Sequence, residues 1–198
     1  MTPLVLASAS TSRAKLLAAA GIDHIRDPAD IDESRIKHDS REEGWDTTVC
    51  AMRLAEAKAK AVAARHPGAL VLGADQMLEC DGYWFDKPAD RDAARTQLRM
   101  LSAKEHTLIT AAAIMRDDVV LWRAIELPRL TLRALSDEFL DHYLDVAGDT
   151  VLRSVGAYEL EGLGAQLMAQ IDGDHFAILG LPMLSLLNFL RAEGALLS

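Results

Sequence analysis

Two stretches of the chain are apolar without the alternation of polar and apolar positions that marks a half-exposed strand: residues 4–7 and residues 70–72. Such runs of Leu and Val are typical of strands that are buried on both faces, as in the centre of a mostly parallel sheet. The second run stops at the small pair Gly73-Ala74 and leads into Asp75. We therefore expect Asp75 at the carboxyl end of a strand, where open α/β sheets bind their ligands.

The first apolar run leads into a turn rich in hydroxyl groups, from Ser8 to Arg13, and then into a helical stretch over residues 14–20 that ends at Gly21. Free backbone N–H groups and the helix dipole favour an anion at such a turn, and Arg13 adds a full positive charge. The alternative is that one of the serines, or Thr11, only caps the helix. The turn is a phosphate site on the first interpretation and a structural feature on the second.

A charged segment separates this helix from a second, longer one. Residues 23–44 carry many charges and little periodicity, so we expect a solvated loop, from which one carboxylate could fold back over the strand ends. Helical periodicity begins near Asp46 and stops at Pro67-Gly68. Lys58 and Lys60 on this helix point in different directions, so at most one of them faces a site.

Beyond Asp75 the pattern predicts further hairpins, strands and helices. Asp81-Gly82 predicts a tight hairpin that returns Asp86-Lys87-Pro88 toward the strand ends and Asp75. The stretches 107–115 and 119–133 are interpreted as antiparallel strands, and Asp172-Gly173-Asp174 as a second hairpin. Helices are expected over residues 90–101, 136–148 and 182–190. Glycines at 156, 162 and 164 mark either a place where backbone approaches a ligand or a connecting loop.

Composition narrows the class of protein. The chain has 198 residues, which suits one domain, and half of them are hydrophobic, as in ordinary globular proteins. A formal net charge of -9 makes nucleic acid and anionic membrane surfaces poor partners, because both require a basic face. No apolar run approaches the length of a membrane span, and the first residues lack the basic start of a signal peptide. We expect a cytoplasmic protein.

The motifs exclude several kinds of chemistry. The six histidines show no metal-binding pairs, and Cys50 and Cys80 lack C-x-x-C spacing, so core thiols are the better interpretation of both. Neither a nucleophile elbow nor a P-loop pattern is present. What remains is Asp75, acids near Glu33 and cations on separate elements, namely Arg13, Lys58 and Lys87. Carboxylates hold Mg²⁺ or accept a proton, and cations neutralise phosphate charge, so this combination suits phosphoryl chemistry on a nucleotide. Two alternatives stay open: an α/β domain without such chemistry, and a dehydrogenase-like binding protein.

Several short motifs, in order along the chain, resemble the Maf family of nucleoside triphosphate pyrophosphatases, which includes septum formation proteins. They are Leu6-Ala7-Ser8-Ala9-Ser10 with Arg13, Leu54-Ala55-Glu56-Ala57-Lys58-Ala59, Gly73-Ala74-Asp75, Asp86-Lys87-Pro88, Leu101-Ser102 with His106, Gly156-Ala157-Tyr158, and Asp172-Gly173-Asp174 through Gly180-Leu181-Pro182. The resemblance implies one domain over residues 1–198. It also implies an α/β fold with an elongated, mixed, mainly parallel sheet flanked by helices, with a cleft between two lobes as in inosine triphosphate pyrophosphatases.

The same resemblance implies a reaction and a site. Metal-assisted water attacks a nucleoside triphosphate, with Mg²⁺ or Mn²⁺ as cofactor, and releases a monophosphate and pyrophosphate. Asp75 matches the general base and Glu33 an acid near metal and water, so both are candidate metal ligands. The phosphate-binding positions match Ser8, Arg13, Lys58 and Lys87. The family is often homodimeric, and its link to septum formation makes a non-catalytic nucleotide-binding regulator the alternative.

Departures from the family pattern concern the base. Gln76 and Glu161 resemble the subgroup that acts on 7-methyl-GTP, whereas many members carry threonine and glutamine there; many also carry glutamate in place of Lys15. A carboxylate accepts from both N–H donors of a guanine edge, which makes Glu161 a candidate reader of that edge. Ser12 argues the other way, since that subgroup tends to have a tryptophan there. The dTTP and UTP class stays open.

Overall fold

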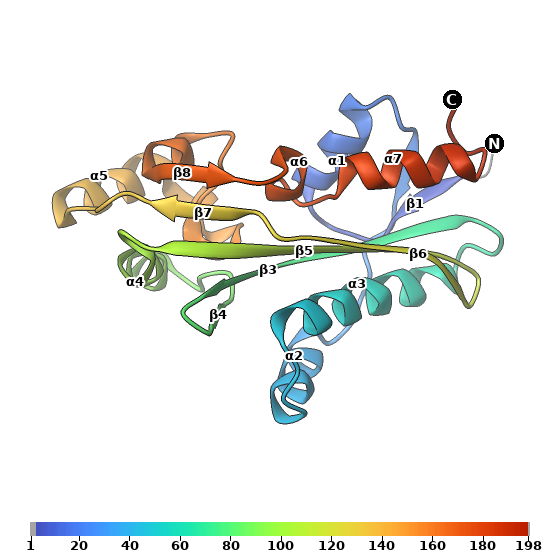
Figure 1. The fold of residues 1–198 in the computed structure, drawn as a ribbon, viewed down its shortest axis with the longest axis horizontal. Coiled ribbons are helices and arrows are strands. Elements are labelled where there is room, and N and C mark those ends of the chain that lie inside the picture. The colour runs from blue at the N-terminus through green and yellow to red at the C-terminus, as the bar shows by residue number, and fades with distance from the viewer. Residues whose placement is uncertain (1–2, 198) are drawn as a thin grey trace. The chain divides into compact units, whose positions relative to one another are not determined.

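A mixed sheet runs through the structure. In the computed structural model, which describes residues 3–197, eight strands form one sheet in the order β2-β1-β3-β5-β7-β8, with β4 added to β3 and β6 to β5. The pairs of β1 with β2 and β3 are parallel, and those of β5 with β6 and β7 are antiparallel. The expected α/β fold with a mixed sheet and flanking helices is confirmed (Figure 1).

The bounds of the elements are as follows. The strands are β1 Leu4–Leu6, β2 His24–Arg26, β3 Leu70–Cys80, β4 Tyr83–Phe85, β5 Glu105–Arg116, β6 Val119–Glu126, β7 Arg129–Leu132 and β8 Met168–Asp172. The α-helices are α1 Thr11–Ala19, α2 Glu33–Glu42, α3 Thr47–Ala63, α4 Arg91–Leu101, α5 Asp137–Ala147, α6 His175–Ile178 and α7 Met183–Ala192. Three short 3₁₀ turns lie at Gly148–Leu152, Val155–Ala157 and Leu163–Leu167.

The chain divides into two compact units. The first contains the residues up to 76, residues 110–126 and the residues from 174 on, and the second contains residues 77–109 and 127–173. Strands β3 and β5 each contribute residues to both units. Among the described helices, none is long and apolar enough to cross a membrane.

The first unit buries both faces of β1 and of the first half of β3. Leu4, Leu6, Leu70 and Leu72 pack in one cluster with residues of α1 and α7, while the alternate residues Val5 and Val71 pack in another with α3. This alternation follows from the period of two in a strand. Figure 1 shows α1 and α7 on one side of these strands and α3 on the other. The interpretation of the two apolar runs as fully buried strands is confirmed.

Helix α3 lies unusually close to β3 at Gly73. A Cβ atom there would stand 2.0 Å from the backbone oxygen of Ala55 and 2.6 Å from the backbone nitrogen of Ala59. Both alanines are fully buried. Only glycine allows this approach, because any side chain would overlap the helix backbone.

Strand β3 is longer than expected. It continues to Cys80, so Asp75 lies in mid-strand and the prediction that it ends the strand is wrong. The strand continues because its second half pairs with β4 through the predicted hairpin, in which Asp81 and Gly82 both have positive φ. Parallel pairing with β1 nevertheless stops at Leu72, the partner of Leu6, so Asp75 lies beyond the carboxyl end of β1.

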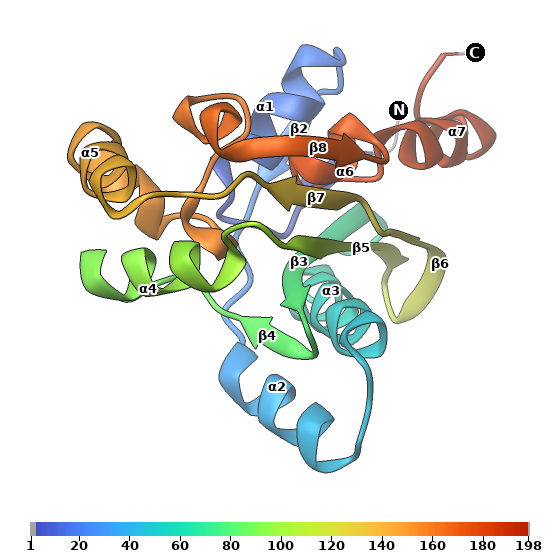
Figure 2. The ribbon, with the colours of Figure 1, turned by 60° about the vertical axis from the view of Figure 1, so that its left-hand side comes forward.

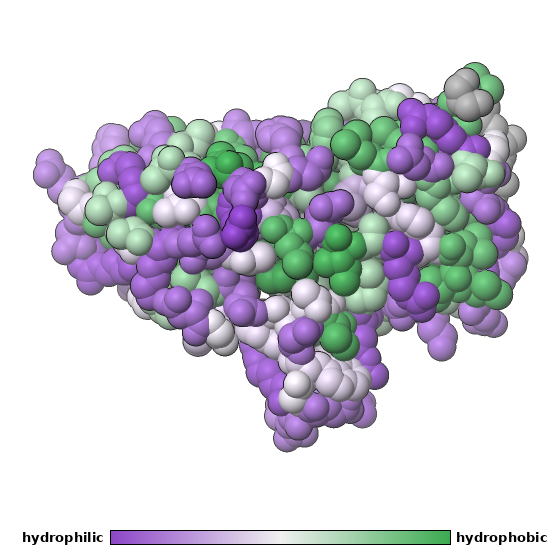
Figure 3. All heavy atoms as spheres, in the orientation of Figure 1, coloured by the Kyte–Doolittle hydropathy of each residue, from purple (hydrophilic) through white to green (hydrophobic). Residues whose placement is uncertain are grey.

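The charged segment over residues 23–44 is not the loop that its composition suggested. It forms β2, which pairs with β1, and helix α2. The Asp32 side chain accepts from the Arg35 backbone N–H and caps α2, which then packs against α3 with Ser40 buried. The Asp32 cap and the contact with α3 thus stabilise α2, although its sequence lacks the apolar periodicity of a typical buried helix. Figure 3 shows a mostly hydrophilic surface on the segment that carries α2.

Two other expectations are corrected. The stretch 119–133 breaks into β6 and β7 at Leu127-Pro128, where proline cannot donate to a ladder. Asp172-Gly173-Asp174 is not a hairpin, because the Asp174 side chain accepts from the Ala177 N–H and starts α6 instead. Figure 2 shows β8 leading into α6.

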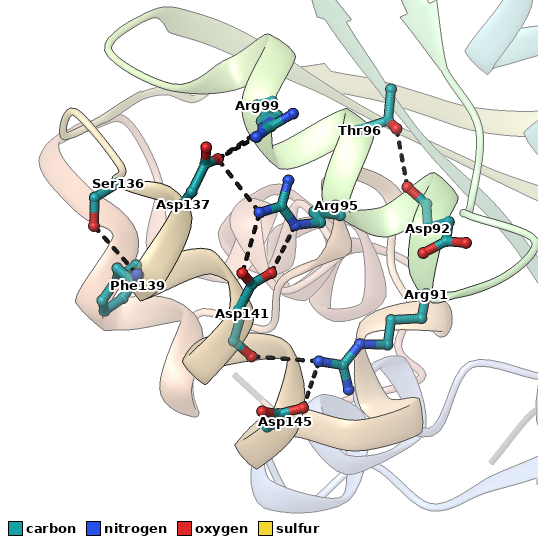
Figure 4. A network of polar contacts seen from close by, with 10 residues as sticks. All are labelled: Arg91, Asp92, Arg95, Thr96, Arg99, Ser136, Asp137, Phe139, Asp141 and Asp145. Carbon is teal, nitrogen blue, oxygen red and sulfur yellow. Dashed lines mark hydrogen bonds and ion pairs between the residues drawn. The ribbon is translucent and has the colours of Figure 1, made fainter.

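The second unit joins α4 and α5 by a ladder of ion pairs (Figure 4). Its arginines and aspartates are each spaced four residues apart, so each set lies on one helix face. The pairs are Arg91 with Asp145, Arg95 with Asp137 and Asp141, and Arg99 with Asp137. The Arg95 hydrogen bonds are the largest cause that lowers the pKa of Asp141 below 3.8.

Replacing Gly73 with alanine tests the close approach of α3. We expect Gly73→Ala to lower the free energy of unfolding by about 1–3 kcal/mol, the usual cost of forcing a methyl group into a packed interior. Urea denaturation measures this. Gly162→Ala is the control, because a Cβ there would meet only the Glu159 oxygen at 3.7 Å. Equal effects of the two changes would contradict the interpretation.

The ion-pair ladder predicts a dependence of stability on pH. Because the folded-state pKa of Asp141 is lowered, its contribution is present above 3.8 and is lost as the pH falls through the lowered value. Asp141→Asn should therefore lower the melting temperature at about pH 7, and this deficit should shrink at about pH 2. Glu138→Gln on the same helix is the control, and a deficit that does not change with pH would disprove the role of the ladder.

Candidate active site

Three charged side chains of the first unit, Glu33, Lys58 and Asp75, are linked by ion pairs and form the charged cluster of this unit. The Lys58 Nζ atom lies 2.6 Å from Asp75 Oδ1 and 2.8 Å from Glu33 Oε1. The Lys58 and Asp75 side chains are 10% and 8% exposed, whereas that of Glu33 is 46% exposed. One ammonium group thus bridges a buried carboxylate and a half-exposed one.

Each residue of this charged cluster is positioned by a different element. Asp75 comes from β3, and Lys58 comes from α3 between Ala55 and Ala59, the two residues that touch the Gly73 backbone. Glu33 is the first residue of α2, directly after the capping residue Asp32. Of the two lysines on α3, only Lys58 is buried and Lys60 is exposed, which confirms that they point in different directions.

Arg13 is anchored beside this charged cluster. Its guanidinium donates to the Ala74 oxygen at 2.9 Å, to the Gly180 oxygen at 2.9 Å and to Ser8 Oγ at 3.0 Å. Desolvation lowers the pKa of this buried arginine, and the negative charges of Asp75 and Glu33 act in the opposite direction. The capping alternative for the Ser8–Arg13 turn is confirmed, and the phosphate site stays a prediction. Ser10 caps α1, accepting from the Arg13 backbone N–H, while the Arg13 side chain points into the interior.

Gln76 has a fixed amide group. Its Nε2 atom donates to Thr110 Oγ1 at 2.9 Å and to the Ala177 and Ile178 oxygens, both at 3.0 Å. Carbonyl oxygens only accept, so the network determines which end of the amide is nitrogen. Thr110 in turn donates to the Ala177 oxygen at 2.8 Å. The amide oxygen of Gln76 has no hydrogen-bond partner among residues 3–197 and is available as an acceptor.

The segment that holds Arg13 and Gln76 in place belongs to one of the family motifs, but sequence reasoning gave it no role in the site. Residues 174–180 supply the Ala177 and Ile178 oxygens to Gln76 and the Gly180 oxygen to Arg13. Thr110, which is fully buried, was missed as well. Two signals were available for residues 174–180: the family motif itself, and Asp174, whose residue type suits a helix cap as well as a turn.

The remaining candidates have less to report. Ser12 is half-buried on α1. Lys87, which follows β4, and Glu161, which precedes the third 3₁₀ turn, are exposed residues of the second unit. Neither Lys87 nor Glu161 belongs to the charged cluster of the first unit.

A buried pair in the second unit joins two motifs of the sequence. His106 Nε2 lies 2.7 Å from the Tyr158 hydroxyl, and its Nδ1 is buried without a hydrogen-bond partner. Burial lowers the pKa of His106 to about 4 and raises that of Tyr158. The His106 imidazole is therefore neutral at physiological pH, and its hydrogen bond to Tyr158 lies in the interior of this unit.

The donor atoms of the first unit suit a hard cation. Asp75 and Glu33 offer carboxylate oxygens, and Mg²⁺ is commonly bound through one or two carboxylates together with water and substrate phosphates. Within residues 3–197, no group of three or more His, Cys, Asp or Glu side chains could form a complete protein cage for a metal. The residues therefore fit a divalent cation that shares its coordination with a phosphate.

Comparisons with known proteins find one family over nearly the whole chain. The model of a family described as Maf-like protein matches residues 3–193. A protein of Paramagnetospirillum magneticum is 53% identical over 192 residues, covering 97% of this chain and 99% of that protein. A Hyphomonas neptunium protein is 47% identical, covering 98% and 97%, and a Rhodospirillum rubrum protein is 44% identical, covering 99% and 97%. All three are named nucleoside triphosphate pyrophosphatase. The chain belongs to the Maf family.

Proposed function

We propose that this protein is an enzyme that hydrolyses a nucleoside triphosphate to a monophosphate and pyrophosphate. The observation that carries the proposal is the buried Asp75, bridged by Lys58 to Glu33 and placed beside Arg13. The names of the relatives support the activity. The family model spans parts of both units, which supports treating residues 1–198 as one functional domain.

In the proposed reaction, water attacks the α-phosphorus. A bond forms between the water oxygen and phosphorus, the bond from phosphorus to the bridging oxygen breaks, and pyrophosphate leaves with the electron pair. The Asp75 carboxylate accepts the proton from water, a role that needs a positioned base. Asp75 and Glu33 would hold Mg²⁺ or Mn²⁺, which would supply positive charge to the phosphate oxygens.

The cations take the phosphate groups in this proposal. Arg13 offers a guanidinium held in one orientation, and Ser8 lies within hydrogen-bond distance of it. Lys58 supplies an ammonium group, and Lys87 is proposed as a further phosphate ligand from its place in the motif Asp86-Lys87-Pro88. Positive groups aimed at the phosphates stabilise the charge that develops on the leaving pyrophosphate.

We further propose that Gln76 and Glu161 select the base. The free amide oxygen of Gln76 accepts from a base N–H, which guanine, uracil and thymine all possess. A carboxylate at Glu161 adds an acceptor for two neighbouring donors, and only a guanine-like edge offers these. A guanine base, 7-methylated or not, is therefore the favoured substrate class, with dTTP and UTP as the alternative.

The activity is tested by incubating the protein with Mg²⁺ or Mn²⁺ and a panel of 7-methyl-GTP, GTP, UTP and dTTP, and by measuring released pyrophosphate. We expect turnover on at least one member. Asp75→Asn should bind that nucleotide and lose activity by about 100-fold or more, as expected for loss of a positioned base. Binding without turnover in the unmodified protein would favour a non-catalytic regulator, and full activity of Asp75→Asn would remove Asp75 from the mechanism.

The choice of base is tested by Glu161→Gln. We expect the ratio of kcat/KM for a guanine nucleotide to that for UTP to fall by about tenfold or more, because a charge-assisted hydrogen bond is lost. Glu159→Gln, two residues away, is the matched control and should leave the ratio unchanged. An unaltered ranking of bases in Glu161→Gln would exclude Glu161 as the reader.

A further inference from the structure

The position of Lys58 has a consequence for metal binding. Its ammonium group contacts Asp75 at 2.6 Å and Glu33 at 2.8 Å, the two carboxylates that fit a divalent cation. A lysine ammonium is a compact point charge with three donors. A divalent cation held by these two carboxylates would therefore compete with Lys58 for them.

The charges of the cluster are already balanced. Asp75 and Glu33 face two cations, Lys58 by direct contact and Arg13 through its electrostatic interaction with both carboxylates. Adding a divalent cation alone would place excess positive charge in a largely buried region, where like charges repel strongly. Adding it together with a triphosphate supplies negative charge that offsets the excess.

The two cations differ in their freedom to move. Arg13 is anchored by hydrogen bonds to two backbone oxygens and to Ser8. The hydrogen bonds and ion pairs of the Lys58 side chain are to the two carboxylates, of which Glu33 is half-exposed on α2. Lys58 also has a flexible four-carbon stem. It can turn from the carboxylates to a phosphate oxygen while Arg13 stays in place.

We propose that Lys58 occupies the two carboxylates in the nucleotide-free protein, excludes the divalent cation, and releases them only when a triphosphate provides another partner for its ammonium group. The metal then binds strongly only together with the nucleotide. This inference rests on the proposed function and assigns Lys58 the role of coupling the two ligands. By reciprocity, metal and triphosphate raise the affinity of the protein for each other by the same factor.

The first test is a titration with Mn²⁺ alone, followed by the electron paramagnetic resonance signal of free Mn²⁺. Lys58→Met should bind Mn²⁺ at least about tenfold more tightly than the unmodified protein, within the range typical of coupled sites. Lys60→Met is the matched control, because Lys60 is an exposed residue of the same helix, and it should bind like the unmodified protein. Equal affinity of Lys58→Met and the unmodified protein would overturn the proposal.

The second test repeats the titration with a triphosphate whose α,β-bridging oxygen is replaced by methylene. The analogue should tighten Mn²⁺ binding to the unmodified protein by about tenfold or more and should have a smaller effect on Lys58→Met. An equal effect on both proteins would overturn the role of Lys58. Circular dichroism checks the fold, and Lys58→Gln, which keeps a polar side chain, replaces Lys58→Met if the latter does not fold. Absence of turnover in the substrate panel would reject the proposed function without changing the Mn²⁺ titration.

Discussion

A buried carboxylate requires a positive partner, and Asp75 obtains one through the close packing of α3 against β3. Asp75 lies on a central strand with a side chain only 8% exposed, where an isolated charge would cost several kcal/mol. Gly73, two residues earlier, lets the backbone of α3 come into contact with β3. Lys58 then reaches Asp75 from the same helix turn that touches the glycine. The absence of a side chain at Gly73 thus allows Lys58 to become the partner of Asp75.

The C-terminal segment of the first unit completes the site with backbone atoms. Residues 174–180 present carbonyl oxygens to Arg13 and to Gln76, so the orientations of a cation and of an amide depend on the same turn. Side chains that use their donors on fixed backbone acceptors lose little freedom when a ligand binds, which is the physical basis of preorganisation. Lys58 is the contrasting case, since its recorded partners are the side chains of two carboxylates and it can exchange them.

The second unit adds two kinds of polar contact to its apolar interior. Its helices α4 and α5 face each other through exposed arginine and aspartate side chains, whereas His106 and Tyr158 share a hydrogen bond in its interior. Salt screens the exposed pairs, and acid protonates their carboxylates. The buried pair is shielded from salt but not from acid, because the folded protein keeps His106 neutral with a pKa of about 4, whereas the unfolded chain protonates it near pH 6.5. Acid therefore weakens both kinds of polar contact in the second unit, whereas salt weakens the exposed pairs.

The sequence by itself determined the buried strands, the hairpin at Asp81-Gly82 and the different directions of Lys58 and Lys60, because periodicity and turn chemistry are local properties. The mixed α/β class followed from the family resemblance. It failed at residues 23–44, where α2 forms without an apolar face, and at Asp174, which suits a helix cap as well as a turn. Only the tertiary structure decided that Lys58 bridges Glu33 and Asp75, and that residues 174–180 hold Arg13 and Gln76. Those contacts join residues far apart in the chain, and no local pattern records which of several charged groups will meet once the helices pack.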